Sequence, residues 1–224
     1  MKLALFDVDG TLVDSRAMIT ASIVEAFSAT GLVLPPRETL MDFVGLSLVD
    51  AMRGLAPAAS DADHHRLADA YKEAFWGFRS RGDHLEDLFD GARELLTNLH
   101  GRDDVLLGIA TGKSRRGVAH LLAAQKLEGW FATVQTSDDH PSKPHPSMVV
   151  QALSETGVRP EDAIVIGDTS FDIGMARAAG AGAIGVTWGN HPMGELEHAG
   201  AHVIVSDFKQ LASALESLWQ ERRG

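Results

Sequence analysis

The second half of the chain alternates short apolar runs with segments of helical periodicity, and this alternation limits the folds open to it. The apolar runs have the length of β-strands and lie at 105–110, 132–136, 163–166, 183–186 and 202–205. Helices are expected over 92–99, 115–127, 146–156, 173–179, 194–198 and 208–219. Strands joined through helices pair in parallel, because each crossover returns the chain to the same end of the sheet. The sequence therefore predicts an α/β fold with a doubly wound, Rossmann-like parallel sheet.

One further strand is expected far from the others, at 3–6. It is followed by four segments of helical spacing, at 16–30, 37–44, 48–55 and 61–78. The sequence shows no convincing strand between residues 15 and 84. Because the first strand precedes these helices and its partners follow them, the helices are expected to form an insertion. We expect an all-helical cap over 15–84, a core made of 1–14 and 85–224, and a hinge at Asp14 and Ser15.

Two carboxylates, Asp7 and Asp9, directly follow the first strand. Residues two apart on a strand point the same way, so these groups are expected to repel each other in one small volume. A bound Mg²⁺ ion would offset this repulsion, because it prefers oxygen ligands. Asp168 follows the strand at 163–166 and would complete a metal site with Asp7. Taken alone, the first stretch also fits a strand followed by an Asp/Gly turn.

Other polar groups follow strands at the same expected edge of the sheet. The Thr111 hydroxyl and the amides from Gly112 onward could hold phosphoryl oxygens. Lys143 lies between prolines that restrict its backbone, and Asp172 lies near the start of a helix. Each also has a plainer interpretation, as a helix cap or a solvated loop charge. The segment 188–191 follows a strand end as well, and either lines the site or packs and turns.

Charge and composition limit the kinds of molecule that the protein is expected to bind. The chain has 224 residues with 20 basic and 31 acidic side chains, a formal charge of -11 that repels nucleic acid. No apolar run approaches the roughly 18 residues of a membrane helix. Without cysteine, a metal must be held by oxygen or imidazole. We therefore expect a cytoplasmic protein, monomeric or homodimeric, that binds neither nucleic acid nor membrane.

A local basic cluster stands out against this acidic background. Lys113, Arg115 and Arg116 follow the Thr111-Gly112 pair, where they could steer an anionic substrate. Solvated charges on the first turn of a helix are the alternative. Cations at a helix N-terminus oppose the helix dipole, which favours a functional use.

The chain resembles the haloacid dehalogenase-like hydrolase superfamily, in its phosphoglycolate phosphatase-like branch, through four motifs: Asp7-Val-Asp-Gly-Thr-Leu-Val-Asp, Thr111-Gly112, Lys143-Pro144 and Gly167-Asp168-Thr169-Ser-Phe-Asp172. The helical insertion resembles the family's helical C1-type cap. Residues 44–48 resemble the cap loop that faces the active site in such members. The resemblance implies a phosphatase acting on a small phosphorylated metabolite.

The resemblance also implies roles for the two leading carboxylates. Asp7 would attack phosphorus to form an aspartyl-phosphate that water later hydrolyses. Asp9 would be the general acid for the leaving alcohol and then the general base for water. The carboxylates of Asp7 and Asp168 and the backbone carbonyl of Asp9 would bind Mg²⁺.

For the phosphoryl group itself, the resemblance implies that Thr111, Gly112 and Lys143 stabilise charge on its oxygens. Asp172 would support the site by orienting Lys143 or a metal-bound water. Lys113 is a further candidate for contact with the substrate.

Several other functions stay open. A sugar phosphomutase or a pyrophosphatase would use the same aspartyl-phosphate, and a receiver-like or non-catalytic regulator would accept phosphate without turnover. The loop 44–48 contains no lysine or arginine, which argues against phosphonoacetaldehyde hydrolase and weakens the phosphomutase interpretation. A dehalogenase would have no use for Asp9 or Asp168. The physiological substrate cannot be read from the sequence.

Overall fold

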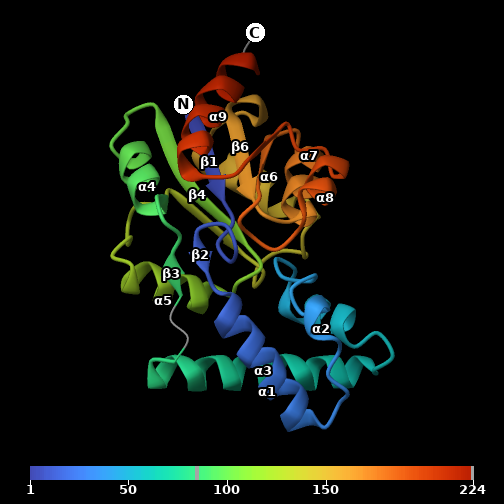
Figure 1. Cartoon of the computed structure of the whole chain (residues 1–224). Helices are drawn as coiled ribbons and strands as arrows, with labels where there is room; N and C mark the ends of the chain where they lie inside the picture. Colours follow the sequence, from blue (N-terminus) through green and yellow to red (C-terminus); the bar gives the residue numbers. More distant parts are fainter. Residues whose placement is uncertain (84–85, 223–224) are drawn as a thin grey trace.

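The computed structural model describes residues 1–83 and 86–222. Its main sheet is parallel, with the strand order β5-β4-β1-β6-β7-β8 (Figure 1). The strands are β1 (Lys2–Phe6), β4 (Val105–Thr111), β5 (Thr133–Thr136), β6 (Ala163–Gly167), β7 (Gly182–Val186) and β8 (Val203–Val205). The order runs outward from β1 in both directions, which confirms the doubly wound α/β fold predicted from the sequence.

Each face of the sheet carries its own apolar layer. Along β1, Ala4 and Phe6 pack on one side, whereas Leu3 and Leu5 pack on the other. The first face is covered by α4 (Ala92–His100), α5 (Arg115–Ala124) and α9 (Phe208–Glu221). The second is covered by α6 (Ser147–Thr156), α7 (Ser170–Ala178) and α8 (Met193–His198). Burial on both faces explains why the strands read as continuous apolar runs.

The helices of the insertion pack around a separate apolar cluster. They are α1 (Arg16–Thr30), α2 (Leu48–Leu55) and α3 (Asp61–Arg81), and their shared core includes Phe27, Met52 and Leu67. In Figure 1 they lie beyond the end of the sheet toward which β1 points. The inserted helices therefore cover the carboxyl ends of the strands, where parallel sheets bind ligands.

The prediction of a helix over 37–44 was wrong. A short 3₁₀ helix, η1 (Arg37–Thr39), is followed by turns whose backbone amides bond three residues back, as from Val44 to Met41. Leu40, Met41 and Val44 still point into the apolar cluster of the inserted helices. Tight turns thus bury these side chains in place of an α-helix. Their spacing in the sequence resembles that of a helix because such turns also bring residues three apart to the same side.

A small antiparallel pair of strands was not foreseen. It joins β2 (Val13–Asp14) to β3 (Asp87–Leu88), where the chain leaves the core and returns to it. Two-residue strands leave no periodicity to detect. The remaining strands and helices begin and end within three residues of their predicted bounds. Within residues 1–83 and 86–222, no helix is long and apolar enough to cross a membrane.

The core of the inserted helices can be tested with two substitutions on α1. Phe27 is 1% exposed, whereas Val24 is 42% exposed on the same helix. We expect Phe27→Ala to lower the free energy of unfolding by about 3–5 kcal/mol, because it leaves a cavity. Val24→Ala should change it by less than about 0.5 kcal/mol. Urea unfolding followed by circular dichroism measures both, and equal effects would contradict the packing described here.

Candidate active site

The polar residues predicted at the strand ends do meet in space. Asp7, Thr111 and Asp168 end or follow β1, β4 and β6, which are neighbours in the sheet. Lys143 reaches the same place from the loop between β5 and α6. All four are buried. The adjacency of three strand ends is what assembles the site.

Lys143 is the centre of a buried charge cluster. Its ammonium group donates to Asp7 Oδ1 at 2.8 Å and to Asp172 Oδ1 at 2.6 Å. Burial lowers the pKa of Lys143, but the carboxylates of Asp172 and Asp7 outweigh burial and raise it above its ordinary value. Lys143 therefore stays charged, with a fixed position between two acids.

Asp172 is held by the start of its own helix. Its Oδ2 accepts hydrogen bonds from the Thr169 amide at 3.1 Å and the Thr169 hydroxyl at 2.6 Å. In return, the Thr169 side chain accepts from the Asp172 amide, which completes a capping box. This leaves Asp172 Oδ1 directed at Lys143. Asp172 therefore caps its helix with one carboxylate oxygen and contacts Lys143 with the other.

Asp168 is held by Thr11, which belongs to the first motif, and by Asn190, from the segment 188–191 that was expected either to line the site or to pack and turn. Its Oδ1 accepts from the Thr11 hydroxyl at 2.8 Å, and its Oδ2 accepts from the Asn190 amide at 2.8 Å and the Asn190 side chain at 2.9 Å. A Cβ at Gly10 would lie 2.3 Å from Asp168 Oδ2, and Gly10 has a φ of 87°. Only glycine fits there. Asn190 also shows that the segment 188–191 contributes to the site.

The acidic cluster fits a hard divalent cation. Asp7, Asp168 and Asp172 each offer a carboxylate oxygen, and these oxygens lie within 4.8 Å of one another. Among the described residues, Asp7 Oδ2 is buried without a hydrogen-bond partner. Oxygen donors of this kind suit Mg²⁺, and an orphaned buried oxygen needs a positive partner. The residues at hand therefore fit the metal expected from the sequence.

Burial perturbs the same carboxyl groups. It raises the pKa of Asp7 to about 8, with repulsion from Asp172 and Asp168 adding to the effect and Lys143 opposing it. Burial, followed by repulsion from Asp172, raises the pKa of Asp168 to about 7. A bound cation would favour the ionised forms of both groups.

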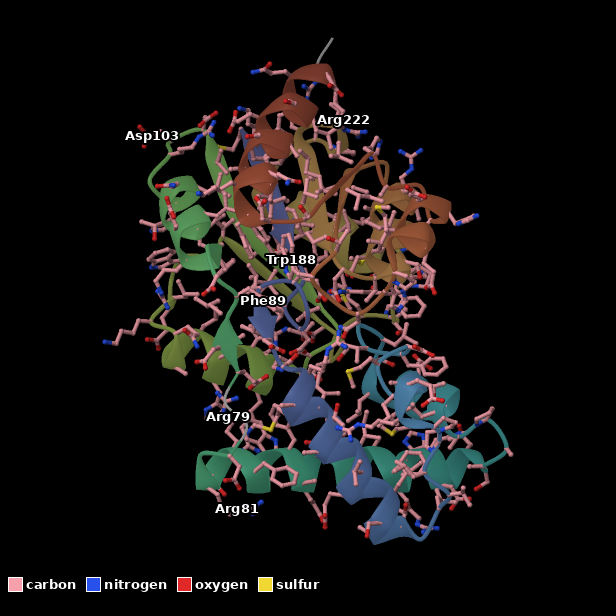
Figure 2. All side chains as sticks on the ribbon, in the orientation of Figure 1. Arg79, Arg81, Phe89, Asp103, Trp188 and Arg222 are labelled. Carbon is pink, nitrogen blue, oxygen red and sulfur yellow. The ribbon has the colours of Figure 1, made fainter. Side chains whose placement is uncertain are left out.

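Asp9 has a different set of partners from Asp7. The Lys113 ammonium donates to its two carboxylate oxygens at 2.9 and 3.2 Å, and to Glu86 Oε1 at 2.6 Å. Glu86 also accepts from Arg79, which points from α3 toward the core in Figure 2. A chain of ion pairs thus runs from Asp9 to the inserted helices. Glu86 and Arg79 carried no sequence signal, because neither belongs to a motif.

The basic cluster of Lys113, Arg115 and Arg116 divides among separate partners. Arg115 pairs with Asp139, and the guanidinium of Arg116 lies over the Trp76 ring at 4.0 Å. Lys113 is engaged as described above. The three cations therefore do not present one common face.

A cavity of about 320 Å³ lies between the strand ends and the inserted helices, and both Asp7 and Asp9 line it. The loop 44–48 contributes to its wall, as expected. A Cβ at Gly112 would lie 2.4 Å from the Leu46 carbonyl oxygen, and the Ser47 amide donates to Ser142 Oγ at 2.8 Å. The loop is thus closed against the core.

The fold and the site together define a class: a doubly wound parallel α/β core with a buried acidic centre beneath a helical insertion. Comparison with known sequences identifies the family. The family profile described as haloacid dehalogenase-like hydrolase matches residues 4–186. The chain belongs to this family, as its motifs indicated.

Similar proteins carry the names of several phosphatases. The chain is 33% identical over 220 residues to "Probable phosphatase IndB" of Dickeya dadantii, covering 96% of this chain and 94% of the relative. It is 29% identical to "Pyrophosphatase PpaX" of Oceanobacillus iheyensis, covering 94% and 95% of the two chains. A hydrolase crystal structure from Pseudomonas syringae superposes with a TM-score of 0.85 at 28% identity, covering 97% and 99%.

The raised carboxyl pKa values predict a pH-dependent response to Mg²⁺. The folded protein retains protons that the unfolded chain releases, so metal-free stability falls as pH rises from about 4 to about 8. Protons compete with the cation at low pH. We expect Mg²⁺ to raise the Tm more at about pH 8.5 than at about pH 6. Differential scanning fluorimetry measures this, with Asp168→Asn as the variant that should lose the response. A larger shift at the lower pH would contradict the prediction.

Proposed function

We propose that this protein is a Mg²⁺-dependent phosphatase that hydrolyses small phosphate monoesters through a phosphorylated Asp7. One observation carries the proposal: Asp7 lines the cavity, its Oδ1 is held by Lys143, and its Oδ2 has no partner among the described residues. A carboxylate held in this way has one oxygen for attack or metal binding. Relatives named as phosphatases support the proposal.

The first half-reaction transfers the phosphoryl group to Asp7. A carboxylate oxygen of Asp7 forms a bond to phosphorus while the ester oxygen departs with its bonding electrons. Asp9 donates a proton to that oxygen, so that a neutral alcohol leaves. Mg²⁺, held by Asp7, Asp168 and the backbone carbonyl of Asp9, would offset the charge repulsion between carboxylate and phosphate.

The second half-reaction returns Asp7 to its free form. Asp9 accepts a proton from water, whose oxygen attacks phosphorus and displaces the Asp7 carboxylate. Thr111, the Gly112 amide and Lys143 stabilise the charge on the phosphoryl oxygens, and Asp172 positions Lys143. Because the Lys113 ammonium already contacts Asp9 and Glu86, we assign Lys113 to positioning Asp9.

The domain division belongs to the proposal. Residues 15–84 would act as a cap, and 1–14 with 85–224 as the catalytic core. The separate apolar cluster of α1, α2 and α3 supports this division, as does the β2 and β3 pair at the two crossings. The closed contact between the loop 44–48 and the core would exclude water during phosphoryl transfer.

Release of phosphate from p-nitrophenyl phosphate tests the function. Activity should require Mg²⁺ and disappear with a chelator. Asp7→Asn should lower kcat by about 10⁴-fold or more, because it removes the nucleophile. Its Tm should not fall, because it removes a buried carboxylate of raised pKa. Substantial activity in this variant would refute the covalent route.

The proton-transfer role of Asp9 predicts a dependence on the leaving group. Asp9→Asn should lower kcat/KM for an alkyl phosphate by about 10²–10⁴-fold. The loss should be smaller for p-nitrophenyl phosphate, whose leaving group needs no proton. The constant kcat/KM is the proper readout because it reports the step that expels the leaving group. Equal losses for both esters would rule out Asp9 as the acid.

A further inference from the structure

The cavity above Asp7 has mainly apolar walls where the inserted helices form it. Its lining there includes Ile19 and Ile23 from α1, Met52 and Leu55 from α2, and Phe75 and Trp76 from α3. In the mechanism proposed above, the phosphate sits at the strand ends, so this part of the cavity receives the leaving group. The side chains that line this part of the cavity therefore indicate the chemical nature of the leaving group.

The cations that line the cavity are already engaged. Lys113 contacts two carboxylates, as described above. Lys72 pairs with Asp69 at 3.0 Å and is 57% exposed, and Arg116 stacks on Trp76. A second anionic group on the substrate, such as the carboxylate of phosphoglycolate or the second phosphate of pyrophosphate, would compete with Asp9 and Glu86 for Lys113 or would lie against the apolar side chains named above. Binding such a group would cost the desolvation of its charge.

The size of the cavity admits a ring system. An apolar cavity of about 150 Å³ holds benzene, and the volume here is about 320 Å³. Burial of a ring against Phe75 and Trp76 would also gain the contact energy of aromatic pairs.

A tyrosine adds a hydroxyl group to this mainly apolar wall. Tyr71, on α3, lines the cavity. Burial raises the pKa of Tyr71, so the hydroxyl keeps its proton and can donate a hydrogen bond. A hydroxyl donor in a mainly apolar wall suits a leaving group with a polar atom near the phosphate.

We propose that the substrate is the phosphate monoester of an apolar, ring-bearing alcohol or phenol with no second anionic group. The proposal rests on the phosphatase function and specifies its substrate class. Such a substrate differs from the pyrophosphate that the names of the pyrophosphatase relatives indicate.

Substrate comparison tests the proposal. We expect kcat/KM for 2-phenylethyl phosphate, an alkyl ester like phosphoglycolate, to exceed that for phosphoglycolate and for pyrophosphate by at least about tenfold, because ring burial is worth roughly 1.4 kcal/mol or more. A preference for either anionic substrate would overturn the substrate class while leaving the phosphatase function intact. Absence of turnover with all three would instead overturn the phosphatase function.

A binding measurement keeps the two failures apart. Calorimetry with 1-naphthol requires no turnover, and we expect it to bind the wild-type protein. Ala51→Leu, on α2 and within the cavity lining, should weaken this binding and raise KM for 1-naphthyl phosphate by about tenfold without changing KM for methyl phosphate. Ala62→Leu, exposed on α3, is the matched control and should change neither. No binding of 1-naphthol, or equal effects of the two variants, would overturn the proposal.

Discussion

The site depends on one buried cation among three buried acids. Lys143 has no solvent-exposed side-chain surface, and it contacts Asp7 and Asp172 directly. Such a cluster is unfavourable unless each charge is paired, because burial removes hydration. Lys143 compensates part of the negative charge, and the unpartnered Asp7 oxygen marks where compensation is incomplete. This uncompensated negative charge suits a bound cation, which would in turn offset the repulsion between the acids and a phosphate.

The scaffold holds this cluster in place through rigid neighbours. The strands β1, β4 and β6 are buried on both faces, so the residues at their ends have little freedom. Asp172 is fixed by the capping box of α7, and Asp168 by Thr11 and Asn190. Preorganised groups of this kind need not reorient as charge develops in a transition state.

The inserted helices and their loop 44–48 contact the edge of the sheet that carries the candidate active site in two ways. Their loop 44–48 contacts the core near Gly112, and their helix α3 is tied to Asp9 through Arg79, Glu86 and Lys113. The first contact closes the cavity. The second links the position of α3 to the carboxyl group proposed to move protons. The proposed roles in substrate selection and proton transfer would thus be linked through the inserted helices.

The sequence by itself determined the parallel α/β fold, the helical insertion and the meeting of Asp7, Thr111, Lys143 and Asp168. It could do so because apolar runs and the polar residues that follow them are local signals, and parallel strands bring their ends to one edge. It did not reveal the turns at 37–44, the β2 and β3 pair, or the contacts of Thr11, Glu86 and Asn190. The strand pair and the three contacts join residues far apart in the chain, whereas the turns at 37–44 are local but bury the side chains that a helix there would bury. Tertiary structure alone decided which carboxylates share Lys143, that Lys113 pairs with Asp9, and that the inserted helices line the cavity mainly with apolar side chains. The reason is that the choice of partner follows proximity in space rather than order along the chain.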